Sequence, residues 1–275
     1  MYSKNIFLIL FLFFVQFSCK KANQNQFTTL ECNPEPLPLY DSIVGTIMDD
    51  HGIPLRDTLL DLIERKTTVF QPCREMIYQT KFSDKNNEII SSGRIKMMAT
   101  GRKWKFQPEK QVEVALQYEY TAEDYEKCKE HQLNTKLGFD HWINEATEGV
   151  IENVEKVWMH PFRFNQYTFT EVAPFPEVIF PLSIGKSWTG RLSLQEGWGD
   201  WENSSGSFKY KVVARENIGT KYAEIQNCWK IESKATYSFG ESKLNYWFHE
   251  ELGFVKFEYL NYGHQKLMIE LAEVH

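Results

Sequence analysis

Two residues three positions apart, Cys128 and His131, have the best spacing for chemistry in this sequence. On a helix this spacing puts both side chains on one face, where Cys73 or His141 could complete a zinc site. Only two of the four ligands have local spacing, however, and a disulfide at Cys128 with a solvated His131 is the simpler interpretation. We therefore expect no metal and no cofactor.

Acidic side chains gather in several places without forming a recognisable catalytic pattern. The run Asp49-Asp50-His51-Gly52 offers metal ligands, but Asp and Gly are also what a tight turn requires. Pairs such as Glu250-Glu251 are expected by chance in a chain with 37 acidic residues. The motifs of zinc proteases, serine hydrolases, phosphate-binding loops, dinucleotide-binding loops and EF-hands do not occur. The sequence therefore predicts no enzyme, and an envelope hydrolase is the least favoured alternative.

Two tryptophans flanked by glycines, Trp198 and Trp201, are the best candidates for ligand binding. Exposed at a loop, the two rings could stack on a sugar or lie at a lipid headgroup layer. The alternative is that they fold back as a lid on the protein's own sheet.

The composition is that of an ordinary globular protein. The chain has 275 residues, of which 42% are hydrophobic, and its formal net charge is -6. Without a basic field it is not expected to bind nucleic acid. A mean hydropathy of -0.46 also excludes a protein with many membrane spans.

The first eighteen residues have the pattern of an export signal. An unbroken apolar run of ten residues, Ile6 to Val15, follows Lys4 and is too short to span a bilayer. Ser18-Cys19 follows this run and resembles the lipobox of bacterial lipoproteins, which implies cleavage before Cys19 and acyl chains on it. An ordinary cleaved signal is the alternative. We expect a cell-envelope protein, anchored by lipid to the outer membrane and facing the periplasm.

The resulting organisation has three parts. Residues 1–18 form the signal peptide, and residues 19–40 form a lipidated, proline-rich tether because alternating prolines favour extended chain. Residues 41–275 form a globular β-rich region, which could divide into an α+β part, 41–153, and a C-terminal meander, 154–275.

Four further cysteines remain after Cys19, an even number in an oxidising compartment. They allow two disulfides in three connectivities that the sequence does not separate. The alternative for the last of them is a small buried apolar residue in a strand. The four are Cys32, Cys73, Cys128 and Cys228.

The N-terminal half of the globular region mixes hairpins with short helices. Residues 44–55 read as strand, turn and strand, and residues 59–66 then look helical after a cap at Asp57. The spacing of Thr121 and Asp124 is typical of a helix start, so residues 123–131 are the best helix candidate.

The C-terminal third alternates between apolar and polar residues. Phe208, Tyr210 and Val212 face one way, and Lys209 and Lys211 face the other. The last 94 residues have no proline, so each strand can be hydrogen-bonded on both sides. This pattern predicts an antiparallel meander with one buried face, curled into a half-barrel or open barrel, with one or two short helices from the N-terminal half.

This layout loosely resembles the half-barrel lipid carriers of the LolA, LolB and LppX types. The pattern Tyr246-Trp247 followed by residues 251–256 is also similar to uncharacterised envelope lipoproteins. The one-sided alternation of the strands, together with the lipid anchor, leads us to expect an apolar ligand or lipid held in the curled sheet, with Trp198 and Trp201 near its mouth. The alternative is a structural or partner-binding envelope component with no small ligand, and the sequence does not identify a protein partner.

Overall fold

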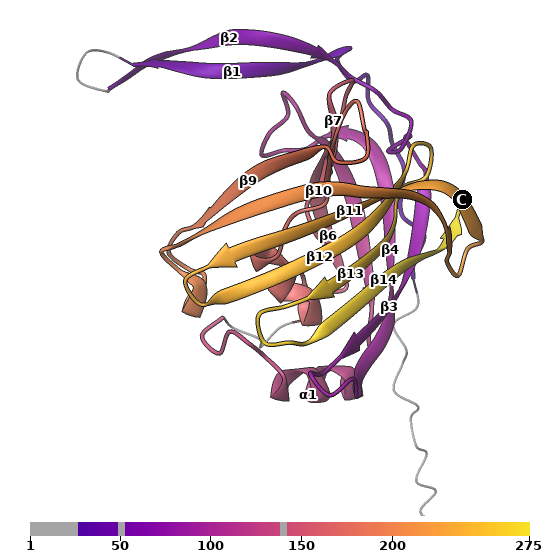
Figure 1. The fold of residues 1–275 in the computed structure, drawn as a ribbon. Coiled ribbons are helices and arrows are strands. Elements are labelled where there is room, and N and C mark those ends of the chain that lie inside the picture. Colours follow the sequence, from indigo (N-terminus) through magenta and orange to yellow (C-terminus); the bar gives the residue numbers. More distant parts are fainter. Residues whose placement is uncertain (1–26, 49–52, 138–141) are drawn as a thin grey trace, which may run out of the picture.

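The computed structural model describes residues 27–48, 53–137 and 142–275. These residues form one large antiparallel sheet, a separate hairpin, one α-helix and two short 3-10 helices (Figure 1). The fold is mainly β, as predicted. The strands of the large sheet are β3 (Glu75–Ser83), β4 (Ile89–Lys103), β5 (Val112–Glu119), β6 (Glu145–Glu152), β7 (Lys156–Met159), β8 (Glu177–Ile179), β9 (Ser187–Leu194), β10 (Ser204–Gly219), β11 (Glu224–Tyr237), β12 (Gly240–His249), β13 (Gly253–Leu260) and β14 (Lys266–Val274).

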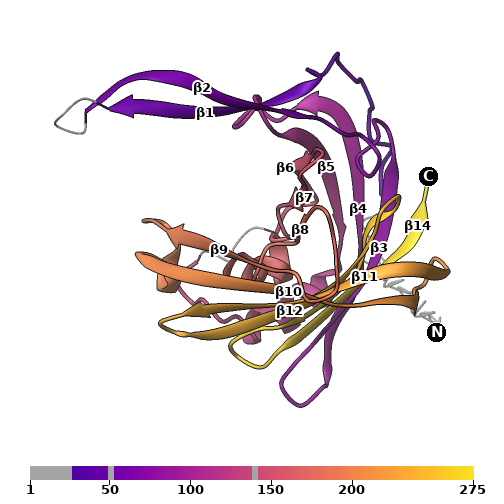
Figure 2. The same cartoon turned by 45° about the horizontal axis from the view of Figure 1, so that its top comes forward.

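Two meanders share this sheet and meet at one strand pair. The strand order is β8-β7-β6-β5-β4-β3-β14-β13-β12-β11-β10-β9. Every pair of adjacent strands is therefore consecutive in the sequence, except for β3 and β14. The sheet curls, but its end strands β8 and β9 do not pair with each other, and it stays open (Figure 2). The predicted half-barrel is confirmed, and the meander extends into the N-terminal half.

The alternation seen in the sequence places the core on the concave face. Phe208, Tyr210 and Val212 are buried, while Lys209 and Lys211 are exposed on the convex face. The buried side chains of both meanders belong to a single hydrophobic cluster.

The helix predicted near residue 123 is confirmed as α1 (Ala122–Glu130). Thr121 caps it, because its hydroxyl accepts from the Asp124 N–H at 3.0 Å and the Asp124 carboxylate accepts from the Thr121 N–H at 2.8 Å. This reciprocal capping satisfies two backbone donors that a helix start leaves free. No helix in the described residues is long and apolar enough to cross a membrane.

A hairpin of β1 (Tyr40–Met48) and β2 (Pro54–Glu64) projects from one end of the sheet (Figure 1, Figure 2). The two strands predicted within residues 44–55 are confirmed, but the predicted helix over 59–66 is wrong. Leu59, Asp61 and Leu62 pair instead with Val44, Ile43 and Ser42 of β1. Pairing across the hairpin has overridden a local pattern that suited a helix.

The second half of the predicted tether lies against the body. Cys32 forms a disulfide with Cys73, the Glu35 N–H donates to the Gly101 carbonyl at 3.0 Å, and the Lys103 N–H donates to the Glu35 carboxylate at 2.7 Å. Thr28 also contacts the body, since its carbonyl accepts from Lys96 at 3.3 Å, so the described part of the predicted tether is fixed to the sheet. The signal peptide, Cys19 and the Asp49–Gly52 run lie outside the described residues.

Candidate functional site

The concave face of the sheet is covered by the protein's own chain. The 3-10 helix η1 (Asn165–Val172) and its flanks lie inside the curl and are largely buried. Phe162 packs on Tyr78 with ring centroids 5.3 Å apart, and Phe169 stacks on Phe82 at 5.5 Å. A ligand inside the curled sheet would have to displace this segment.

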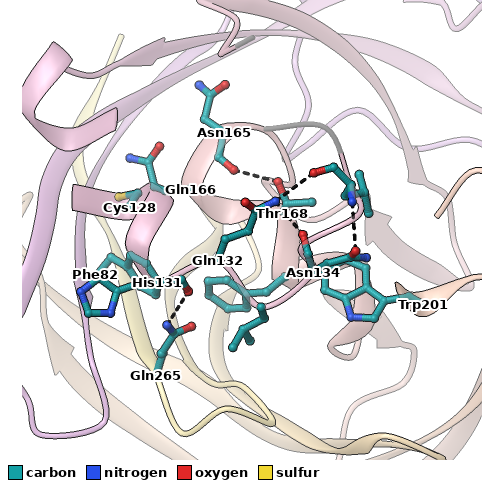
Figure 3. Close-up of a pocket in the computed structure, with 13 residues that line it drawn as sticks. Phe82, Cys128, His131, Gln132, Asn134, Asn165, Gln166, Thr168, Trp201 and Gln265 are labelled. Carbon is teal, nitrogen blue, oxygen red and sulfur yellow. Dashed lines mark hydrogen bonds between the residues drawn. The ribbon is translucent and has the colours of Figure 1, made fainter. Parts of the chain in front are cut away.

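A small cavity remains between α1, η1 and the second 3-10 helix, η2 (Gly199–Trp201). Figure 3 shows that Cys128, His131 and Trp201, which stand far apart in the sequence, all line it. Its volume is about 40 Å³, which admits a few water molecules and falls far below the roughly 300 Å³ at which ligand sites begin.

Amide side chains line this cavity and tie its loops together. Asn134 accepts from the N–H groups of Leu137 and Asp200 at 3.1 and 2.9 Å, and it donates to the Trp198 carbonyl at 2.8 Å. Gln265 donates to the His131 carbonyl at 2.7 Å. These groups therefore hold loops in place and leave little polar capacity for a ligand.

The two tryptophans of the 197–201 loop fold back on the sheet. Trp201 is 2% exposed, and its indole N–H donates to the Tyr262 hydroxyl at 2.8 Å. Trp198 is half-buried and packs against the core. The loop has the geometry of a lid, and a ligand-binding role for these two residues stays a prediction.

The cysteines form one of the two predicted disulfides. Cys32 and Cys73 are bonded, whereas Cys128 and Cys228 are free and buried, as the alternative for Cys228 anticipated. Burial raises the pKa of the Cys128 thiol to about 12 and that of Cys228 to about 11, so both stay protonated. Cys73 cannot ligate a metal from within a disulfide, and no cluster of three potential ligands exists in the described part of the chain. His141 lies outside that part.

A buried charge cluster crosses the inside of the curl. Arg163 lies 2.8 Å from Glu148 and 3.2 Å from Glu171, and both carboxylates are buried. Burial raises the pKa of each glutamate, while Arg163 opposes that rise. Burial also lowers the pKa of His160 nearby to about 3, which keeps its ring neutral. The arrangement neutralises charge in the core, and none of these groups lines a cavity of ligand size in the described residues.

A larger hollow lies at one rim of the curl, beside the base of the hairpin. Its volume is about 470 Å³, within the range of ligand sites. Lys66, Glu250 and Glu251 line it together with apolar side chains from both meanders. The apolar lining residues are Val69, Val154, Val157, Phe180, Pro181, Leu182, Trp229 and Phe248.

The hairpin exposes an unusual amount of apolar surface. We call residues 39–48 and 53–64, which comprise β1, β2 and their immediate flanks, the apolar arm. Ten large apolar side chains of the arm are from 37% to 77% exposed. They are Leu39, Tyr40, Val44, Ile47, Met48, Ile53, Leu55, Leu59, Leu60 and Leu62. A two-stranded hairpin is at best marginally stable alone in water, so its root must support it.

Buried polar contacts fix the root of the arm to the body. Arg65 lies 2.6 Å from Asp41, and these side chains are 5% and 2% exposed. Asn153 donates to the same Asp41 carboxylate at 2.7 Å. Just beyond β2, the Glu152 carboxylate accepts from the N–H groups of residues 68–70 at 2.8 to 2.9 Å. These buried contacts fix the root of the arm to the body.

Sequence reasoning found the hairpin but missed its exposure. Apolar residues follow one another at 59–60 and 62–63 with no alternation, so both faces of β2 are apolar. A strand with no covered face need not alternate between apolar and polar residues. The lack of alternation in β2 was therefore the signal in the sequence that could have indicated its exposure.

Comparisons with known proteins give only distant likenesses. No protein-family model and no curated protein matches the sequence. A crystal structure from Bacteroides fragilis, described as a candidate exported protein with a YmcC-like fold, aligns with 10% identity and a TM-score of 0.46. A candidate lipoprotein from Parabacteroides distasonis aligns with 8% identity and a TM-score of 0.41. Each alignment covers 75% of this chain and 97% of the other.

Proposed function

We propose that this chain is a lipid-anchored, non-enzymatic protein of the bacterial cell envelope that binds another protein through its apolar arm. The ten exposed apolar side chains of the arm carry the proposal. With roughly 150–250 Å² for a large side chain, their exposed fractions amount to about 1,000 Å². Monomeric proteins rarely expose patches above a few hundred Å², whereas a stable interface buries about 800 Å² on each partner.

A protein suits this surface better than a lipid bilayer does. The hairpin has two open edges, and their unpaired N–H and C=O groups would each cost several kcal/mol in hydrocarbon. A protein groove can supply a strand that pairs with such an edge. Acidic side chains on the arm would also be repelled by an anionic membrane surface.

The charge of the arm specifies the rim of the partner's groove. Asp57, Asp61 and Glu64 are exposed on β2, against one exposed base, Arg56. We therefore propose an apolar groove bordered by lysine or arginine side chains, because complementary charge speeds association and fixes register.

The anchor and the envelope location rest on separate observations. The Ser18-Cys19 pattern after the apolar run supports lipidation, and the Cys32–Cys73 disulfide is typical of oxidising compartments. Labelling with palmitate tests the anchor directly: the label should attach to the parent chain and be lost in Cys19→Ser. A parent chain without label would refute lipidation and leave the arm to be tested on its own.

Photo-crosslinking in the native host tests the arm. Leu55 and Leu60 are each 64% exposed on the arm, and Ile184, on the body, is a matched control at 65%. A crosslinker at either arm position should trap one discrete protein, and the trapped residues should lie in an apolar groove with a basic rim. Equal trapping from Ile184, or none from the arm, would contradict the proposal.

The hollow at the rim supports a second candidate, an apolar ligand. Because the concave face is filled, we place the small apolar molecule in this hollow of about 470 Å³. Native mass spectrometry of the chain from its host should then show a co-purifying lipid mass that Val154→Trp, at the wall of the hollow, removes. An identical mass spectrum for the two proteins, apart from the substitution, would exclude this ligand.

A further inference from the structure

The convex face of β9 to β12 carries cations among short hydroxyl side chains. The core side chains of these strands, such as Phe208, point into the curl, so the residues between them face outward. Figure 1 looks onto the wall that contains these strands. The outward residues include Thr189, Arg191, Ser193, Ser205, Ser207, Lys209, Lys211, Lys234, Thr236 and Lys243, together with the acids Glu232 and Glu241.

Three lysines stand in one row across adjacent strands. Lys209 is paired with Lys234, and Lys234 is paired with Lys243. Like charges directly opposite each other destabilise a sheet. Lys234 lies 2.7 Å from Glu241, but within the described residues neither Lys209 nor Lys243 has a carboxylate within 4.0 Å. The row therefore keeps uncompensated positive charge.

Protection against edge-to-edge aggregation does not explain the row. Lysines serve that purpose on edge strands, whereas β10, β11 and β12 each have a paired strand on both sides. The edge strand is β9, which presents Thr189 and Arg191 beside the row. A bound anion would remove the repulsion.

A broad hollow of about 630 Å³ lies beside the row. Its floor is made of short side chains, Ser205, Ser207 and Thr236, and it is bordered by the longer Arg191 and Lys209. Hydroxyls of this kind both donate and accept hydrogen bonds, as sugar hydroxyls require, and the cations bind phosphate oxygens by charge-assisted hydrogen bonds.

We propose that this convex face binds a phosphate-bearing saccharide, free or as the headgroup of a glycolipid. Lys209, Lys243 and Arg191 hold the phosphates, and the serine and threonine hydroxyls contact the sugar. The acids nearby offset only part of this field. Glu241 is paired with Lys234, accepts from the Thr236 hydroxyl at 3.3 Å and is also attracted by Lys243, while Glu232 lies opposite Lys211 in the next row. Lys209 and Arg191 keep their charge unpaired with any acid in the described residues. The site is separate from the apolar arm and does not depend on its function.

Calorimetric titration of the full chain in uncharged detergent micelles tests the site. One titration adds glucose 1,6-bisphosphate in solution, and the other adds micelles doped with diphosphoryl lipid A, a phosphorylated glycolipid. Lys209→Gln/Lys243→Gln should weaken binding at least tenfold. A matched control, Lys129→Gln/Lys221→Gln, removes the same charge from exposed lysines elsewhere and should change it less than twofold.

The outcomes separate the sources and can overturn the proposal. Binding of the soluble sugar phosphate indicates a free saccharide, and binding of the doped micelles alone indicates a lipid headgroup; both should weaken as salt rises from 50 to 300 mM. The absence of binding in both titrations, or an equal loss of affinity in the lysine-row variant and the control variant, overturns the site. Circular dichroism of both variants should match the parent, since the substituted side chains are exposed.

Discussion

The ion pair at the root of the apolar arm offers the sharpest test of how the arm is held. Arg65→Met keeps most of the side chain's length and apolar stem but removes the guanidinium that lies 2.6 Å from Asp41. The buried Asp41 carboxylate would keep only the Asn153 amide as hydrogen-bond partner. Removing one member of a buried pair typically costs about 3–5 kcal/mol. We expect about 3 kcal/mol, because Asn153 remains.

Hydrogen exchange shows which part of the structure loses stability in Arg65→Met. The arm can open without the rest of the sheet, so the loss should appear as local opening of β1 and β2. A cost of about 3 kcal/mol corresponds to roughly a hundredfold faster exchange of the amides that pair β1 with β2. Amides of β11, in the middle of a twelve-stranded sheet, should keep their exchange rates and serve as an internal control.

The pH dependence gives a second reading of the same variant. Burial raises the pKa of Asp41 above its ordinary value, although Asn153 and Arg65 oppose that rise. Loss of Arg65 should raise it further. Because the pKa of Asp41 is higher in the folded state, its charged carboxylate destabilises the fold at pH values above that pKa. This loss of stability disappears as the pH falls through that pKa and the carboxylate is protonated. The defect of Arg65→Met should therefore be large at pH 7.5 and shrink towards pH 4, and Asp41→Asn/Arg65→Met should be less defective than the single variant at pH 7.5. Unchanged exchange in Arg65→Met, or a double variant as defective as the single one, would refute this explanation.

Three further predictions concern stability, each measured as the free energy of unfolding in urea. Removing the disulfide with Cys32→Ala/Cys73→Ala should cost about 3–4 kcal/mol, given the 41-residue separation of its cysteines; a reductant should lower the parent's stability and leave the variant unchanged. Trp201→Ala should cost about 3–5 kcal/mol, because it empties a buried site. Trp201→Phe should cost less, since it loses chiefly the hydrogen bond to Tyr262, and equal costs would argue against tight packing there. Gly206→Ala should cost about 1–3 kcal/mol, because the new Cβ would lie 2.2 to 2.6 Å from the Tyr237 ring. Gly219→Ala, which meets nothing within 4 Å, should be nearly neutral, and equal effects at the two glycines would contradict this picture of the packing.

The sequence was most informative where one face of a strand is wet and the other is buried. Lys209 alternates with Phe208 and Tyr210, and period-two alternation has few explanations other than a half-buried strand. The Thr121–Asp124 spacing likewise predicted α1, because capping is a local interaction. These features depend on neighbours along the chain or on solvent.

The filling of the curl could not be read from the sequence in the same way. Residues 160–176 contain several aromatic residues and three prolines but no regular period, since η1 is a 3-10 helix between irregular stretches. Their burial depends on the curvature of a sheet whose strands come from both halves of the chain. The helix predicted over 59–66 failed for a related reason, because pairing with β1 decided the conformation of β2.

The residues of the candidate site also differ in what the sequence and the fold could show. Cys128 and His131 were singled out as a pair with metal-ligand spacing and Trp201 as a candidate for ligand binding, and only the fold shows that all three line one cavity too small for a ligand. The apolar arm received no functional role from its sequence, because exposure is a property of what the fold leaves uncovered.

Co-purification from the host measures most directly whether the apolar arm binds a partner. The parent chain and the variant Leu55→Ser/Leu60→Ser would be recovered under identical conditions, with Ile184→Ser as the control for loss of an exposed apolar side chain. We expect one protein at a fixed stoichiometry with the parent and with Ile184→Ser, and its loss from the arm variant while near-ultraviolet circular dichroism stays unchanged. A partner that remains at full stoichiometry on the arm variant, or the absence of any stoichiometric partner on the parent, would contradict it.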